Sequence, residues 1–200
     1  MNHHRAPEKI RAWLDAALIL LTALSLGGCV TPPKVRRDGD RVLYDQPERE
    51  NIAKITAMLV TLGPNTDSAE AALIAETAVR TGAECAERYH VNLSPDFHNM
   101  LVNRGLRPRG LCWQWTWDMA AALGPLKPKT FDYHWCVADW TEREEHNTIV
   151  VTARGGLYRE GITIDPWISS GFVTSNYVLK DKKHQWVERL PPAGAPSIVY

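Results

Sequence analysis

The chain has 200 residues, of which 44% are hydrophobic, and its 23 lysines and arginines balance its 23 aspartates and glutamates. This length is sufficient for one folded domain with a sizeable core. Because there is no excess of positive charge, the composition gives no electrostatic basis for binding nucleic acid, and we expect no nucleic-acid partner.

Residues 1–28 have the pattern of a secretory signal peptide. Three basic residues within 1–13 precede the apolar run LDAALILLTALSLGG, which is followed by Cys29. A cationic start, a short apolar stretch and small residues before the cleavage site are typical of an exported protein. The ending LGGC resembles a bacterial lipobox, which implies that Cys29 is lipidated, although Asp15 departs from the usual apolar stretch. The alternative is an ordinary signal peptide, or a short membrane anchor with a chance cysteine.

The lipobox resemblance implies a protein of the bacterial cell envelope, held by its lipid on a membrane, the outer membrane facing the periplasm. Acyl chains would keep it at that membrane while the folded part stays in water. After the signal peptide, we expect a flexible tether at 29–47, because this segment is polar, contains prolines and has no period. The folded domain is expected at 48–190 and an irregular C-terminal tail at 191–200, where residues 198–200 could dock as an edge.

The first half of the expected domain has the spacing of helices. The segment PERENIAKITAMLVTLG repeats apolar residues at helical intervals, and the segment that follows predicts a long amphipathic helix over about 67–90. A shorter helix is expected in SPDFHNMLVNRG, and another in CWQWTWDMAAALG, which begins near Cys112. On this last helix, we expect Trp113 and Trp117 to share the buried face and Trp115 to lie nearer the surface.

The second half has the composition of strands. The segments TFDYHWCVADW, HNTIVVTARG and GITIDPW are rich in aromatic and β-branched residues, and FVTSNYVL could add a fourth strand. Because helices come first and strands follow without intervening helices, the order predicts an α+β fold with an antiparallel sheet.

Three cysteines remain if Cys29 is lipidated, which is an odd number for an oxidising compartment. A disulfide between Cys85 and Cys136 would leave Cys112 free. Alternatively, both of these cysteines are reduced and buried.

Cys112 is the candidate nucleophile. Pro108 and Gly110 prevent a helix from extending through this segment, so the thiol lies at a helix start, where the helix dipole favours a thiolate. His146 begins one expected strand and Asp165 ends the next, so the fold could bring an imidazole and its orienting carboxylate to the thiol.

Other interpretations of these residues stay open at this point. Cys112 could be a buried structural thiol, Asp165 a turn former, and His134 or His98 the relevant histidine. The spacing of cysteines and histidines is not that of a metal site, and we expect no cofactor.

The segment GLCWQWTWDM, with His146 34 residues after Cys112 and Asp165 19 residues further on, resembles the transglutaminase-like branch of the papain-like superfamily. The resemblance covers about 110–168. It implies N-terminal helices packed on a small antiparallel sheet, with Cys112 as nucleophile, His146 as general base and acid, and Asp165 as orienter. The implied activity is hydrolysis or acyl transfer at amide bonds of peptide or protein substrates, through a thioester. Its location would make envelope peptides or cell-wall stem peptides the substrates.

One part of the family pattern has no counterpart in the sequence. Papain-like enzymes often supply an oxyanion donor a few residues before the cysteine, where this chain has Leu106 and no glutamine. The remaining donors are the Cys112 backbone N–H and the side chains of His98, Asn99 or Asn103. The alternative function is therefore an inactive module of the same fold that binds a protein or glycan partner.

Overall fold

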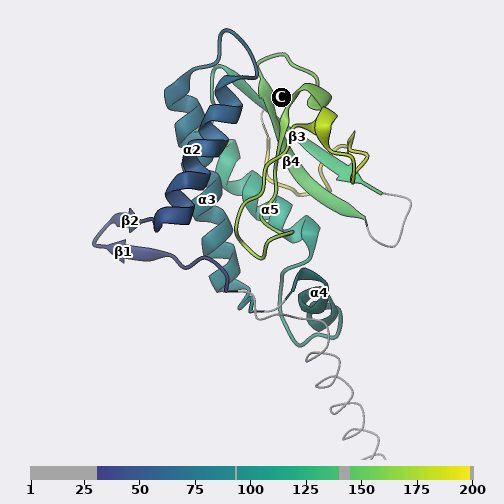
Figure 1. Ribbon diagram of the computed structural model, residues 1–200. Coiled ribbons are helices and arrows are strands. Elements are labelled where there is room, and N and C mark those ends of the chain that lie inside the picture. The colour runs from purple at the N-terminus through teal and green to yellow at the C-terminus, as the bar shows by residue number, and fades with distance from the viewer. Residues whose placement is uncertain (1–30, 93, 140–144, 199–200) are drawn as a thin grey trace, which may run out of the picture.

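A computed structural model of the chain describes residues 31–92, 94–139 and 145–198 (Figure 1). The expected signal peptide and Cys29 lie outside the described residues. Within the described part, no helix has the length and apolar character needed to cross a membrane. The described residues form an α+β fold with four helices and two small antiparallel sheets, as the order of predicted elements indicated.

The described helices are α2 (Gln46–Val60), α3 (Ser68–Arg88), α4 (Pro95–Asn103) and α5 (Cys112–Leu123). All four confirm helices predicted from the sequence. The two longest have side-chain caps: the Asp45 carboxylate accepts from the Glu48 backbone N–H before α2, and the Asp67 carboxylate accepts from two backbone N–H groups before α3. Helix α5 ends at Gly124, where a short 3-10 helix takes over.

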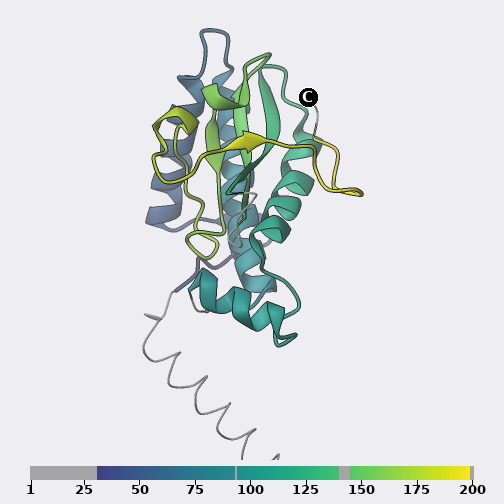
Figure 2. The same cartoon turned by 90° about the vertical axis from the view of Figure 1, so that its right-hand side faces the viewer.

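The larger sheet has four antiparallel strands in the order β5-β4-β3-β6. Their bounds are Phe131–Ala138 for β3, His146–Ala153 for β4, Ile162–Ile164 for β5 and Val187–Glu188 for β6. Helices α2, α3 and α5 cover one face of this sheet (Figure 1), and β6 and the chain around it run across the side away from α2 and α3 (Figure 2). Both central strands are therefore almost completely buried, including polar side chains such as Asp132, His134 and Asn147.

The sequence prediction differs from the structure in three segments. Residues 172–179 are not a strand, because they contribute only two isolated bridges, Ile162 with Tyr177 and Asp165 with Thr174; the fourth strand is β6 instead. Within the expected tether, Arg36–Asp38 (β1) and Arg41–Leu43 (β2) form a small hairpin. In the expected tail, Ile198 is buried in the main core, whereas residues 199–200 lie outside the described part.

The expected placement of the tryptophans on α5 is wrong for Trp115 and Trp113, whereas Trp117 does pack against the core. Trp115 is only 2% exposed, and its ring packs edge-on against Tyr89 at a centroid distance of 4.8 Å. Trp113 is 38% exposed, and Trp117 packs at the edge of the main core. The prediction assumed one buried face, but the N-terminal half of α5 also covers a second, smaller apolar cluster at the end of α3.

The three described cysteines are free thiols. Cys85 lies in the cluster at the end of α3, whereas Cys136 packs with Val150 and Trp186 on the face of the sheet away from the helices. The sheet separates these two positions, so the structure has the reduced, buried alternative and not the disulfide.

Candidate active site

The side chains of Gln114, Trp115 and His98 hold the backbone just before Cys112. The Gln114 side-chain oxygen accepts hydrogen bonds from the backbone N–H groups of Gly110 (2.7 Å) and Leu111 (3.0 Å). The Trp115 indole N–H donates to the Gly110 carbonyl at 2.9 Å. Gly110 has φ +132°, and a Cβ atom there would lie 2.3 Å from the ring of His98. Only glycine fits this turn, which places the thiol at the first position of α5.

Cys112 is buried, and its sulfur donates a hydrogen bond to the Glu145 backbone carbonyl at 3.2 Å. Its backbone N–H belongs to the first turn of α5, where N–H groups have no acceptor within the helix. The nucleophile candidate therefore has both a nearby strand end and a free helix terminus beside it.

His146 and Asp165 form a buried pair directly behind the thiol. The His146 Nε2 atom lies 2.6 Å from Asp165 Oδ2, and the two side chains are 5% and 3% exposed. The second carboxylate oxygen accepts from the Trp167 backbone N–H at 2.9 Å, an Asx turn that fixes Asp165. Because Nε2 is engaged, Nδ1 is the ring nitrogen left for chemistry. It is buried and has no hydrogen-bond partner among the described residues.

The surroundings of His146 favour its charged form. Burial by itself lowers the pKa of this imidazole, but the hydrogen bond to Asp165 and the nearby Cys112 sulfur outweigh it and raise the pKa to about 9. At neutral pH the ring is therefore an imidazolium whose buried Nδ1–H requires an acceptor. The thiolate is the reactive form of cysteine, so a charged imidazole is a suitable neighbour for a nucleophilic sulfur.

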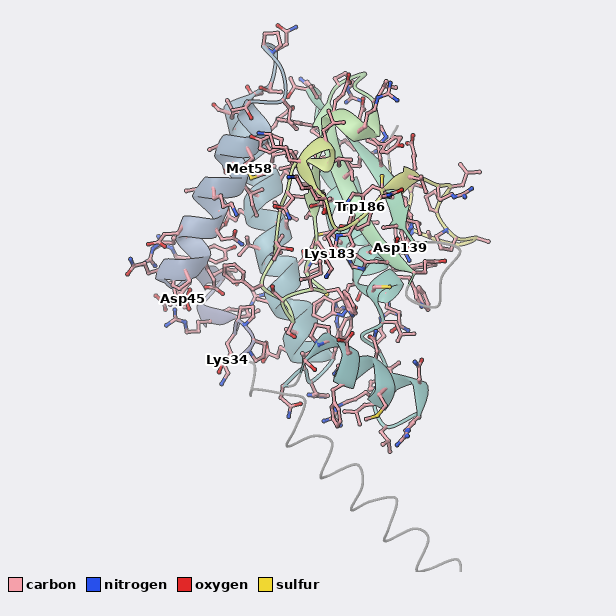
Figure 3. The ribbon with its side chains drawn as sticks, turned by 45° about the vertical axis from the view of Figure 1, so that its right-hand side comes forward. Lys34, Asp45, Met58, Asp139, Lys183 and Trp186 are labelled. Carbon is pink, nitrogen blue, oxygen red and sulfur yellow. The ribbon has the colours of Figure 1, made fainter. Side chains whose placement is uncertain are left out.

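Three aromatic rings enclose the imidazole. The ring centroids of Trp167, Trp186 and His184 lie 4.8, 5.3 and 5.4 Å from that of His146. Figure 3 labels Trp186, one ring of this aromatic wall, and the neighbouring Lys183, over the sheet and away from the outer helix α2. The wall limits the access of water to the His146–Asp165 pair and so strengthens the interaction between them.

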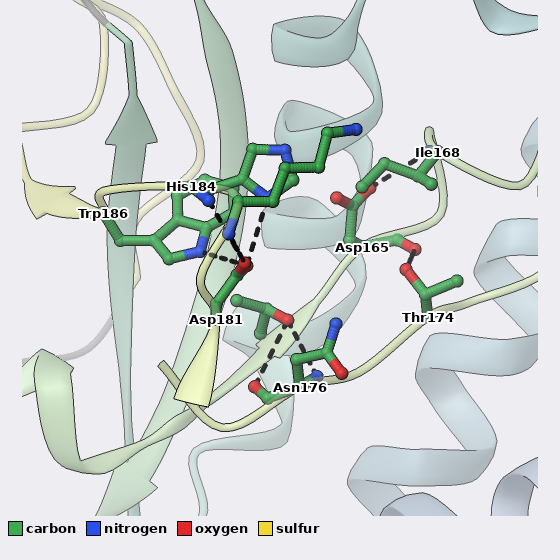
Figure 4. A pocket seen from close by; sticks show the side chains of 9 residues that line it. Asp165, Ile168, Thr174, Asn176, Asp181, His184 and Trp186 are labelled. Carbon is green, nitrogen blue, oxygen red and sulfur yellow. Dashed lines mark hydrogen bonds and ion pairs between the residues drawn. The ribbon is translucent and has the colours of Figure 1, made fainter. Parts of the chain in front are cut away.

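The Asp181 carboxylate holds two residues of the aromatic wall, His184 and Trp186, in place by hydrogen bonds (Figure 4). It accepts from the Trp186 indole N–H at 2.9 Å and from the His184 backbone N–H at 3.1 Å. Burial would raise the pKa of Asp181, but these hydrogen bonds lower it overall. A cavity of about 220 Å³ lies between this turn and Asp165.

Most of this wall was not predicted from the sequence, because His184 and Trp186 belong to a segment without periodicity or motif. The other histidines considered lie elsewhere. His134 bonds Glu188 (2.6 Å) and Thr152 (3.0 Å), and His98 donates to the Arg109 carbonyl (2.9 Å).

The chain matches no family model, no curated protein and no solved structure. The chemistry of the site therefore follows from its geometry alone. A thiol at a helix start, a charged imidazole with one free nitrogen and a buried carboxylate on the other nitrogen form a nucleophile, a proton carrier and an orienting group. Such a set can attack a carbonyl carbon and protonate the group that leaves it.

Proposed function

We propose that the protein is a membrane-anchored cysteine hydrolase or acyltransferase that acts on amide bonds of envelope peptides or cell-wall stem peptides. Its described domain would then be a variant of the papain-like, transglutaminase-like core. The observation that carries the proposal is the 2.6 Å contact between His146 Nε2 and Asp165, which leaves Nδ1 as the only ring nitrogen able to serve Cys112.

In the proposed reaction, the Cys112 thiolate attacks the amide carbonyl carbon and a carbon–sulfur bond forms. The carbon–nitrogen bond then breaks, and His146 gives its Nδ1 proton to the departing amine. The acyl group is left on the enzyme as a thioester. Neutral His146 next takes a proton from water or from a second amine, and the attack of that nucleophile releases the acyl group and regenerates the thiolate. Asp165 holds the ring in the orientation that both steps require.

The lipid anchor at Cys29 is part of the same proposal and rests on the segment LGGC. Labelling of cells with a fatty-acid analogue should mark the wild-type protein and leave Cys29→Ser unmarked. Equal labelling of the two would remove the anchor and the envelope location from the proposal.

An activated ester tests the chemistry without knowledge of the substrate. The full-length protein in detergent is treated with p-nitrophenyl acetate, and the peptide containing Cys112 is examined by mass spectrometry for an acetyl thioester. We expect the wild type and Cys136→Ala, a matched change at a buried thiol that is not a candidate catalytic residue, to be acetylated. His146→Ala should not be. Added methylamine separates transfer to an amine from hydrolysis, and equal acetylation of His146→Ala would contradict the mechanism.

The alternative is a non-catalytic module that binds a protein or glycan partner. One observation favours it: Trp113 is 38% exposed next to Trp117, at a ring distance of 6.3 Å, beside the site. Exposed aromatic rings of this kind commonly contact partners. A wild-type Cys112 that is not acetylated would favour this second function.

A further inference from the structure

Asn147 follows His146 in β4, and strand alternation directs its side chain to the opposite face, towards α5. The side chain is buried, with 4% of its surface exposed. The Trp135 indole N–H, which can only donate, lies 2.8 Å from Asn147 Oδ1. This contact fixes the orientation of the amide, because the reverse orientation would place two donors against each other.

The amide nitrogen of Asn147 consequently points to the nucleophile. Nδ2 donates to the Glu145 carboxylate at 2.9 Å, and it lies 3.9 Å from the Cys112 sulfur. Nδ2 carries two hydrogens, and the Glu145 carboxylate uses one of them. The second hydrogen is directed towards the space around the sulfur, where 3.9 Å is too long for a strong bond.

The side chains that the sequence suggested as oxyanion donors are not available near the Cys112 sulfur. His98 donates to the Arg109 carbonyl at 2.9 Å beneath the loop, and Asn99 accepts from the Trp167 indole at 3.3 Å. Asn103 is exposed at the end of α4. Asn147, by contrast, lines a cavity of about 270 Å³ between β3 and residues 189–192, so its amide borders a cavity as well as the Cys112 sulfur.

We propose that Asn147 is a catalytic residue, which donates an Nδ2 hydrogen bond to the oxyanion formed when Cys112 attacks a carbonyl. The inference rests on the proposed function. As the sulfur–carbon bond forms, the π electrons of the carbonyl move to its oxygen. This oxygen is bonded to the attacked carbon and so lies within reach of Asn147 Nδ2. The Cys112 backbone N–H at the start of α5 is the second donor. Asn147 neither gains nor loses a proton, and the electron pair returns when the amine leaves.

Two reagents separate this role from a purely structural one. Iodoacetamide alkylates the sulfur by displacing iodide from a tetrahedral carbon, so no oxyanion forms. Acetylation by p-nitrophenyl acetate passes through a tetrahedral oxyanion. Both modifications are followed at the peptide containing Cys112, in the full-length protein in detergent.

In Asn147→Ala, we expect acetylation to slow by about 10² to 10³-fold, the usual effect of losing one oxyanion donor, and alkylation to stay near the wild-type rate. The control is Asn51→Ala in α2, which removes another buried amide. The Asn51 side chain donates to the Val173 carbonyl at 2.8 Å. This variant should lower the melting temperature and leave both rates unchanged. If Asn147→Ala does not fold, Asn147→Ser, which keeps a hydroxyl for the Trp135 indole, is measured in the same way.

Each outcome decides the role. A selective loss of acetylation supports it, whereas unchanged acetylation, or equal losses of acetylation and alkylation, would overturn it. A wild-type protein in which Cys112 undergoes neither reaction would instead overturn the proposed function, and the role of Asn147 with it.

Discussion

Asp165 is responsible for much of the positive charge on His146, and the substitution Asp165→Asn tests this directly. The two groups are 2.6 Å apart and almost fully buried, so the carboxylate stabilises the imidazolium without competition from water. An amide of the same size removes the charge. It also places an N–H donor against Nε2, which forces the neutral ring to carry its proton on Nδ1, where it cannot act as a base.

The size of the effect follows from the pKa of His146. The rise from 6.5 to about 9 corresponds to roughly 3 kcal/mol of preference for the charged ring. Because burial alone lowers this pKa, Asp165→Asn should bring it well below 9 and leave the ring largely neutral at pH 7. With the wrong tautomer, we expect the rate of acetylation at Cys112 to fall by about three to four orders of magnitude.

Nuclear magnetic resonance of ¹⁵N-histidine-labelled protein gives the titration of His146 in both forms. The matched control is Glu188→Gln, because Glu188 bonds His134 at the same 2.6 Å in a pair outside the site. It should leave the titration of His146 unchanged. A His146 that titrates identically in the wild type and in Asp165→Asn would refute the reasoning.

Three further predictions concern stability. Because the pKa of His146 is raised, the stability that its charged ring adds to the fold is complete below pH 6.5 and is lost as the pH rises through about 9. The urea concentration at the unfolding midpoint should therefore decrease between pH 7 and 10. The decrease should be smaller in Asp165→Asn. Trp186→Ala should cost about 3 kcal/mol in chemical denaturation, because a 6% exposed ring is lost from the wall; a cost near zero would contradict this packing. Gly110→Ala should destabilise by more than about 2 kcal/mol, whereas Gly105→Ala, also at positive φ but in open space, should cost about 1 kcal/mol; equal melting temperatures would argue against the crowding at His98.

The helices and the long strands were predictable because their signals are local. Asp67 before α3 and Gly124 after α5 mark element ends in the sequence itself. Strand β6 was not predictable, because its two residues form a strand only through pairing with the distant Cys136 and Val137 of β3. The β1–β2 hairpin did have a local signal within the expected tether: a two-residue Gly-Asp turn at 39–40, in which Gly39 has φ +58°.

The triad candidates were predictable for a similar reason, since Cys112 and His146 each begin an element and Asp165 follows one directly. The aromatic wall was not, because it depends on contacts that a loop makes across the sheet. Asn147 was overlooked although it adjoins His146. The family pattern places an oxyanion donor upstream of the cysteine, whereas the Asn147 amide approaches the Cys112 sulfur from strand β4.

The reactivity of Cys112 at pH 6 tests the central claim most directly. If His146 holds the sulfur as a thiolate, iodoacetamide should modify Cys112 roughly ten to a hundred times faster than it modifies glutathione, and His146→Ala should remove this advantage. A Cys112 that resists alkylation in the native protein, or that reacts equally fast without His146, would contradict the account.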